Sequence, residues 1–308
     1  MTQLRRLITY GLVGAGLAMG SLATSVEPPR STAGQFIDAP DGVPLCVYET
    51  GNPAGREILL IHGFSQSHAV FQLQFDSDLA RDHRIVSFDL RGHGCSGKPW
   101  QESAYAGTRV WADDVARVIT ERRLRRPVIV GWSFGGYIAL NYARHHGLDQ
   151  LAALVLVGSN AGLPPAPTDP STVARLAAQR ENNRRAPPDI PVQIAYGQQF
   201  VELMTARPAS EAMQRVMFAT NQMLPTYARR AMHSLALDNQ DLVAKLDRPL
   251  LFIVGDQDKT QSVAVLTRVA ADLPEAAVQV MAGSGHAPFI DAPEDFNRRL
   301  REFVAAHP

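Results

Sequence analysis

The sequence predicts an α/β fold, with a mainly parallel central sheet and helices on both faces. Short apolar runs rich in β-branched residues recur along the chain, as expected of strands that are covered on both faces. Segments with apolar residues at helical spacing lie between these runs, and such alternation specifies parallel strands joined by helices. The third observation is a G-x-S-x-G motif at residues 131–135, directly after one apolar run. In that position the motif is typical of a tight turn from a strand into a helix.

The first strands form an antiparallel hairpin at the sheet edge. Residues 35–38 and 44–49 alternate in hydrophobicity around Asp41 and Gly42, and this pattern is typical of a hairpin. Further strands are predicted at residues 58–61, 85–88, 128–130, 154–157 and 250–254, with a weaker last strand at 278–280. Helices are predicted at residues 108–123 and 134–145, where apolar side chains recur at helical spacing.

Residues 162–247 interrupt this alternation. They begin with a proline-rich linker at 163–167 and continue with helix-like segments that contain several methionines. Methionine at helical spacing is mostly core filler. However, a helical insertion just before a strand that carries a candidate acid is well placed to act as a cap or lid, with soft side chains lining an apolar acyl pocket.

Length and charge restrict the class of protein. The chain has 308 residues, enough for one sizeable core, so we expect a single domain at 26–308 with an insertion. Its 30 basic and 30 acidic residues balance, which argues against a nucleic-acid partner because such surfaces need uncompensated basic charge. The densest basic run, at residues 122–126, ends a predicted helix, where cations complement the helix dipole.

The N-terminal segment differs in composition from the rest. Arg5 and Arg6 precede an uncharged stretch at residues 7–26 that ends in small residues, the pattern of an export signal. The stretch is barely long enough to span a bilayer, and its four glycines weaken a helix. We therefore expect residues 1–25 to direct export to the periplasm or medium. A retained anchor is the alternative, and membrane association would then involve this segment alone.

The two cysteines, Cys46 and Cys95, exclude a disulfide framework and a multi-cysteine metal site. The sequence favours two buried free thiols and leaves a single bridge in an oxidising compartment open. The histidines show no metal-ligand pattern with carboxylates. We expect neither a metal nor a cofactor.

Three residues have the chemistry of a serine nucleophile with its base and acid. A serine hydroxyl becomes nucleophilic when a base removes its proton and a third group orients that base. Ser133 lies in the predicted turn, Asp258 follows one predicted strand and His286 follows the next. The strand ends would bring them to one edge of the sheet, and the order serine, aspartate, histidine is the one that this turn requires. Asp256 competes with Asp258 for the role of acid.

These motifs resemble the α/β-hydrolase fold superfamily over roughly residues 35–305, apart from the insertion. His62-Gly63-Phe64 resembles the segment that supplies one oxyanion N–H, here from Phe64, and the second N–H maps to Phe134. Residues 89–96 resemble the D-x-R-G-x-G-x-S turn. The resemblance favours Asp258 as the acid and leaves Asp256 a capping or loop role. His62 and His93 are expected to stabilise turns.

The resemblance implies a serine hydrolase that cleaves carboxylic esters or lactones of small to medium size through an acyl-enzyme. Its partner would be a small acyl substrate, without a cofactor. Serine at 133 disfavours haloalkane dehalogenases and epoxide hydrolases, which have aspartate at this position. Cofactor-free haloperoxidases or perhydrolases and carbon–carbon bond hydrolases share the same triad. A small-ligand receptor of the same fold is the non-enzyme alternative.

Overall fold

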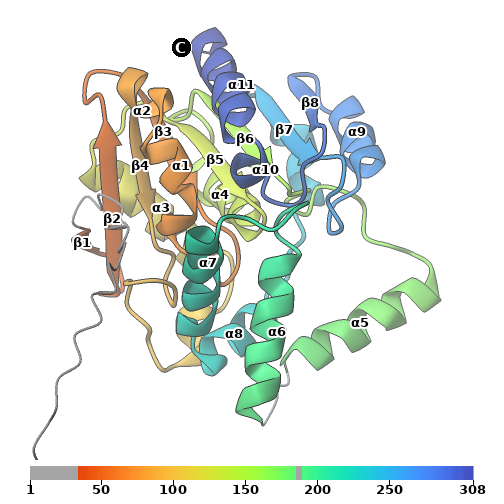
Figure 1. The fold of residues 1–308 in the computed structure, drawn as a ribbon. Coiled ribbons are helices and arrows are strands. Elements are labelled where there is room, and N and C mark those ends of the chain that lie inside the picture. Colours follow the sequence, from red (N-terminus) through yellow and green to blue (C-terminus); the bar gives the residue numbers. More distant parts are fainter. Residues whose placement is uncertain (1–33, 185–188, 308) are drawn as a thin grey trace, which may run out of the picture. The chain divides into compact units, whose positions relative to one another are not determined.

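One eight-stranded sheet forms the centre of the computed structural model, which describes residues 34–184 and 189–307 (Figure 1). The strand order is β1-β2-β4-β3-β5-β6-β7-β8. The strands are β1 (Gln35–Asp38), β2 (Pro44–Gly51), β3 (Arg56–Ile61), β4 (His83–Phe88), β5 (Val128–Trp132), β6 (Ala153–Val157), β7 (Leu250–Gly255) and β8 (Ala276–Met281). Strands β3 to β8 are parallel, and β1 and β2 pair antiparallel at one edge. The predicted parallel sheet and edge hairpin are confirmed.

Helices cover both faces of the sheet, as predicted, and form two separate cores. On one face, Leu59 and Ile61 of β3 pack with α3 (Arg109–Glu121), α4 (Phe134–His146) and α9 (Val263–Ala271). On the other face, Ile58 and Leu60 pack with α2 (Asp78–Asp82), α10 (Pro288–Asp291) and α11 (Pro293–Ala306), beside the short α1 (Gln72–Phe75). Side chains of a strand alternate between faces, so burial on both sides explains the continuous apolar runs.

The strand order reverses beside β3, because β4 lies on one side of it and β5 on the other. In open parallel sheets, ligands bind at the carboxyl ends of the strands where the order reverses. The segments that follow β3 and β5 therefore lie at the position where a site is expected. They contain Phe64 and Ser133.

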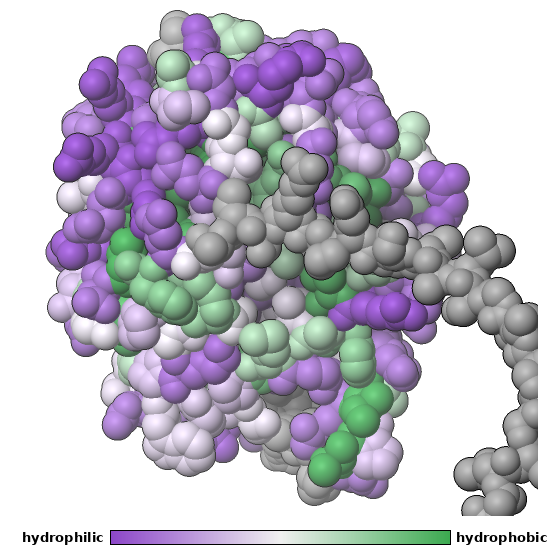
Figure 2. All heavy atoms as spheres, turned by 60° about the vertical axis from the view of Figure 1, so that its left-hand side comes forward, coloured by the Kyte–Doolittle hydropathy of each residue, from purple (hydrophilic) through white to green (hydrophobic). Residues whose placement is uncertain are grey.

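Between β6 and β7, the described part of the insertion contains the helices α5 (Pro170–Arg184), α6 (Ile190–Glu202), α7 (Glu211–Met223) and α8 (Thr226–Met232). Figure 1 shows α6, α7 and α8 at the lower end of the sheet. Met213 and Met217 are buried, as expected of core filler, whereas Met223 is exposed. On the face drawn in Figure 2, the upper left is mainly hydrophilic and hydrophobic side chains are exposed lower down. Exposed apolar side chains of α6 include Ile190 and Tyr196.

The predicted export signal or anchor at residues 1–25 lies outside the described residues. Within residues 34–184 and 189–307, no helix is both long enough and apolar enough to cross a bilayer.

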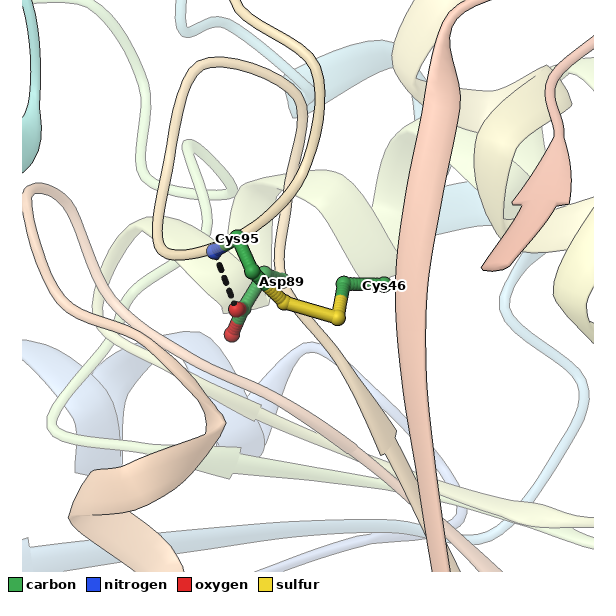
Figure 3. Close-up of side chains that lie close together, drawn as sticks. All are labelled: Cys46, Asp89 and Cys95. Carbon is green, nitrogen blue, oxygen red and sulfur yellow. Dashed lines mark hydrogen bonds between the residues drawn. A yellow bond between two sulfur atoms is a disulfide. The ribbon is translucent and has the colours of Figure 1, made fainter. Parts of the chain in front are cut away.

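A disulfide joins Cys46 of β2 to Cys95 in the loop after β4 (Figure 3). The expectation of two buried free thiols is wrong: Cys46 is buried and Cys95 is exposed. Val47 pairs with Phe88 in the antiparallel β2–β4 ladder, so the loop that follows β4 passes beside Cys46. The bridge closes a segment of 49 residues.

We expect the disulfide to contribute about 4 kcal/mol to the free energy of unfolding, because it closes a long loop and restricts the unfolded chain. Urea denaturation with and without a dithiol reductant measures this difference. A Cys46→Ala/Cys95→Ala double variant should match the reduced protein and should not respond to the reductant. Equal urea concentrations at the unfolding midpoint for the oxidised and the fully reduced wild type would contradict the prediction.

Candidate active site

Ser133 occupies a strained turn between β5 and α4. Its backbone has φ 53° and ψ −116°, a conformation that is unfavourable for a residue with a side chain. The turn is held from both sides: the Ser133 N–H donates to the carbonyl of Val157 at 2.9 Å, and its own carbonyl accepts from the Ser159 hydroxyl at 2.7 Å. A Cβ atom at Gly135 would collide with the carbonyl oxygen of Ile61. Only glycine there allows α4 to approach β3, so the structure has the predicted tight turn.

Asp258 and His286 are in direct contact. The Nδ1 of His286 lies 3.0 Å from Oδ2 of Asp258, and both side chains are buried. Burial alone would raise the pKa of Asp258, but the hydrogen bond and charge of His286, together with the N–H and hydroxyl of Thr260, outweigh it and lower that pKa. Asp258 is therefore a carboxylate at neutral pH, able to orient an imidazole.

Thr260, which no motif in the sequence indicates, adds a second contact to this pair. Its hydroxyl lies 2.8 Å from Oδ1 of Asp258 and 2.7 Å from Nδ1 of His286. A carboxylate only accepts hydrogen bonds, so the hydroxyl donates to Asp258 and Nδ1 of His286 carries the ring hydrogen. The Nε2 atom of His286 is then left with a free lone pair, as a base requires.

Ser133 and His286 belong to neighbouring segments that are joined through Trp132. The indole N–H of Trp132 donates to the carbonyl of His286 at 2.8 Å. Within the described residues, no hydrogen bond joins the Ser133 hydroxyl to the His286 ring. The structure thus brings Asp258 and His286 together and places Ser133 on the adjacent turn.

Asp256 does not reach the histidine. Its side chain is exposed and accepts a hydrogen bond from the Gly283 N–H at 2.8 Å. Asp256 therefore ties the loop after β7 to the loop after β8, which is the loop role that the sequence analysis gives it.

The turn that follows β3, residues 62–68, lies directly against Ser133. A Cβ atom on Gly63 would lie 3.1 Å from Cβ of Ser133, so the glycine permits close approach. Across the described residues, neither the Phe64 N–H nor the Phe134 N–H has an acceptor within the protein. The first N–H groups of a helix lack intrahelical partners, which explains Phe134. Two free N–H groups beside a serine hydroxyl can bind an oxyanion.

Two buried histidines fix this turn to the loop after β4. The Nε2 of His62 accepts from the Leu90 N–H, and the Nε2 of His93 accepts from the Ser65 N–H, each at 3.0 Å. Burial lowers the pKa of His62 to about 4 and that of His93 well below its ordinary value. Both rings are neutral at pH 7 and can accept. Their contacts agree with the turn-stabilising role expected for them.

Residues 57–293 match the family model described as the alpha/beta hydrolase fold. The chain belongs to this family. A putative aryl esterase from Burkholderia cenocepacia is 31% identical, with a TM-score of 0.79 over 89% of this chain and 98% of that one. Esterase RhEst1 from Rhodococcus sp. ECU1013 is 26% identical, with a TM-score of 0.76 over 90% of this chain and 100% of that one. A non-heme haloperoxidase from Rhodococcus erythropolis is 26% identical over 87% of this chain and 98% of its own length.

Asp89 joins the turn after β3, the loop after β4 and strand β2 of this α/β hydrolase. Its Oδ1 accepts from the N–H and the Nδ1 of His68, each at 2.8 Å, and its Oδ2 accepts from the Cys95 N–H at 2.9 Å. The N–H of Asp89 donates to the carbonyl of Cys46 at 2.9 Å. Burial would raise the pKa of Asp89, but the contacts with His68 outweigh burial and lower it.

Figure 3 shows Asp89 beside the two bonded sulfurs. The two sulfur atoms and a carboxylate oxygen of Asp89 lie within 4.8 Å of one another, close enough to be considered as ligands of one metal ion. Metals bind thiolates, and these sulfurs are bonded to each other instead, so the cluster in this form of the hydrolase does not offer a metal-ligand set.

The insertion helices of the hydrolase contact the same turn after β3. Asn221 of α7 donates to the Ser65 hydroxyl at 2.7 Å, and Gln66 donates to the carbonyl of Met217 at 3.1 Å. The guanidinium of Arg229 in α8 lies over the ring of Phe64. These contacts could not be predicted from the sequence, where the one signal is an adjacent arginine pair in a helical segment.

We expect Asp89→Asn to lower the free energy of unfolding at pH 7 by about 2 to 3 kcal/mol, because the N–H groups of His68 and Cys95 lose a charged acceptor on a buried side chain. A carboxyl whose pKa is lowered by folding stabilises above its unfolded pKa, and this contribution is lost as pH falls through the folded pKa. The difference in free energy of unfolding between wild type and variant, measured by urea denaturation, should therefore become smaller as the pH is lowered from 7 to 3. Asp78→Asn, at an exposed aspartate, is the control. A difference that is independent of pH would contradict the prediction.

Proposed function

We propose that the chain is a serine hydrolase that cleaves carboxylic esters or lactones of small to medium size, with Ser133 as nucleophile, His286 as base and Asp258 as acid. The observation that carries the proposal is the buried hydrogen bond between Asp258 and His286, 3.0 Å long, beside the strained Ser133 turn. The similarity of the chain to esterases from Burkholderia cenocepacia and Rhodococcus, over nearly the whole of each chain, supports the same reaction class.

The proposed reaction has two steps. His286 takes the hydroxyl proton at Nε2 while the Ser133 oxygen bonds to the substrate carbonyl carbon. The carbonyl oxygen becomes an oxyanion that accepts from the N–H groups of Phe64 and Phe134, each contributing about 3 to 4 kcal/mol to lowering the barrier. The carbon–oxygen bond to the alcohol then breaks, and the alcohol leaves with the proton from His286. Water, deprotonated by His286, hydrolyses the acyl-enzyme and restores the Ser133 hydroxyl.

Asp258 and Thr260 act on the base rather than on the substrate. When His286 becomes an imidazolium, its positive charge faces the Asp258 carboxylate, which stabilises it. The Thr260 hydroxyl stands 2.7 Å from Nδ1 of the same ring and helps keep the hydrogen on that nitrogen. Nε2 is then the ring nitrogen that is available to accept the Ser133 proton.

A peracid-forming reaction is the second candidate. The similarity to a non-heme haloperoxidase from Rhodococcus erythropolis favours it. In that reaction hydrogen peroxide replaces water in the attack on the acyl-enzyme, and the same residues carry both steps. Measuring peracid formation with peroxide present separates the two activities.

We expect Ser133→Ala to reduce kcat by at least about 10⁴-fold. The measurement is hydrolysis of p-nitrophenyl esters of increasing acyl length by wild type and variant, combined with labelling by a fluorophosphonate probe. Wild type should react with the probe and the variant should not. If wild type neither hydrolyses any ester nor takes the label, the chain is a binding module of this fold rather than an esterase.

We expect Asp258→Asn to reduce kcat by about 10³- to 10⁴-fold, because an amide cannot stabilise the imidazolium and favours the wrong tautomer. Asp256→Asn is the matched control, two residues away with an exposed side chain, and should keep kcat within about twofold of wild type. Loss of turnover in the Asp256 variant instead would reverse the assignment of the acid.

A further inference from the structure

Arg229 carries a partly buried charge that no carboxylate of the described residues balances. Its guanidinium carbon lies 5.4 Å from the centre of the Phe64 ring, and its Nη2 donates to the carbonyl of Asn221 at 2.9 Å. Within residues 34–184 and 189–307, no acidic side chain pairs with it. Its neighbour Arg230 is exposed and pairs with Glu102, so the two adjacent arginines have opposite environments.

The charge on Arg229 persists at neutral pH. Burial lowers the pKa of Arg229 to about 10, which still leaves the guanidinium protonated at pH 7. Partly buried charges in proteins are normally paired, because removing a charge from water is costly. The Asn221 carbonyl accepts a hydrogen bond from one of the several N–H groups of the Arg229 guanidinium. The other N–H groups lie in the same plane and can donate two parallel hydrogen bonds to a carboxylate.

His233 places a second unpaired polar group beside the same ring. It lies one helical turn after Arg229, and its ring centre is 4.8 Å from that of Phe64. In the described part of the chain, neither ring nitrogen of His233 has a hydrogen-bond partner. Burial, followed by the charge of Arg229, lowers the pKa of His233 to about 4. The imidazole is neutral at pH 7, so it can donate an N–H to an anion without adding charge.

Both groups lie close to the proposed reaction centre. Phe64 provides one proposed oxyanion N–H, and its ring also faces that of Phe134, the residue after Ser133, at 6.2 Å between ring centres. The Phe64 ring is therefore in contact both with Phe134 of the nucleophile turn and with Arg229 and His233. A carboxylate held by this guanidinium would therefore lie beside the residue that provides one proposed oxyanion N–H.

We propose that Arg229, assisted by His233, binds a carboxylate of the substrate, and that the preferred substrates are esters carrying a free carboxylate away from the scissile bond. Half-esters of dicarboxylic acids are the simplest members of this class. The inference rests on the proposed esterase function of Ser133 and specifies which esters that site takes.

Two matched substrate pairs test the proposal. Mono-p-nitrophenyl glutarate and p-nitrophenyl valerate differ by a carboxylate on the acyl side, and 4-butyryloxybenzoate and its methyl ester differ by one on the alcohol side. Wild type should prefer the anionic member of at least one pair. Arg229→Gln should reduce that preference, measured as the ratio of kcat/KM values, by at least about tenfold, mainly through KM. Arg230→Gln should leave the ratio unchanged.

Two results would overturn the proposal. One is a wild type that prefers the neutral ester, or shows no preference, in both pairs. The other is an equal loss of kcat/KM for both members of a pair in Arg229→Gln, which would mean that Arg229 supports Phe64 rather than the ligand. Circular dichroism and thermal melting establish whether each variant is folded.

A binding measurement separates this inference from the proposed function. Calorimetric titration of Ser133→Ala with glutarate, and with the neutral glutaramide, needs no turnover. Glutarate should bind and glutaramide should not, and adding Arg229→Gln should abolish glutarate binding. Absence of glutarate binding would count against carboxylate recognition even if neutral esters are hydrolysed. Glutarate binding by a wild type that hydrolyses no ester would instead support the Arg229 site and refute the esterase.

Discussion

The strained backbone at Ser133 is the constraint on which the rest of the site depends. A non-glycine residue at φ 53° costs on the order of 1 to 3 kcal/mol, and tight packing of α4 against β3 and hydrogen bonds to β6 and its following loop offset this cost. Because the turn is held at the carboxyl edge of the sheet, residues after β3, β6, β7 and β8 converge on it. The same packing that forces the strain therefore assembles the candidate site.

The turn after β3 is stabilised from two independent directions. From the sheet side, His62, His93 and Asp89 bind it to the loop after β4, and the disulfide ties that loop to β2. From the insertion side, Asn221 and Met217 contact Ser65 and Gln66. The contacts on both sides involve buried groups, so the sheet and the insertion together hold the Phe64 segment in place. Oxyanion donors are effective when they are fixed before the reaction begins.

The sequence predicted the parts of the molecule that are encoded locally. Strands buried on both faces have continuous apolar runs, and the Ser133 turn has its glycines within two residues, so both could be recognised without knowledge of the fold. The Cys46–Cys95 bond could not, because it depends on the antiparallel register of β2 against β4. Thr260, Arg229 and His233 were missed for a related reason: each is an ordinary residue in its own segment. Their significance comes from partners, or from the absence of partners, on elements far along the chain.

The turn after β3, which carries one proposed oxyanion N–H, lies beside Arg229, a guanidinium with no carboxylate partner among the described residues. This arrangement would affect which substrates the proposed site selects. A partly desolvated guanidinium without a partner has a higher free energy than one paired with a carboxylate. A substrate with a carboxylate would therefore bind with a more favourable free energy than a substrate with a neutral group of the same shape. Because Arg229 reaches Phe64 through the ring face and not through its backbone, the selecting charge is separate from the N–H that would stabilise the reaction. In the proposed site, substitutions in α8 would alter substrate choice while the proposed chemistry at Ser133 stays the same. Neutral His233 fits this arrangement, since a second positive charge beside Arg229 would raise the cost of the empty site.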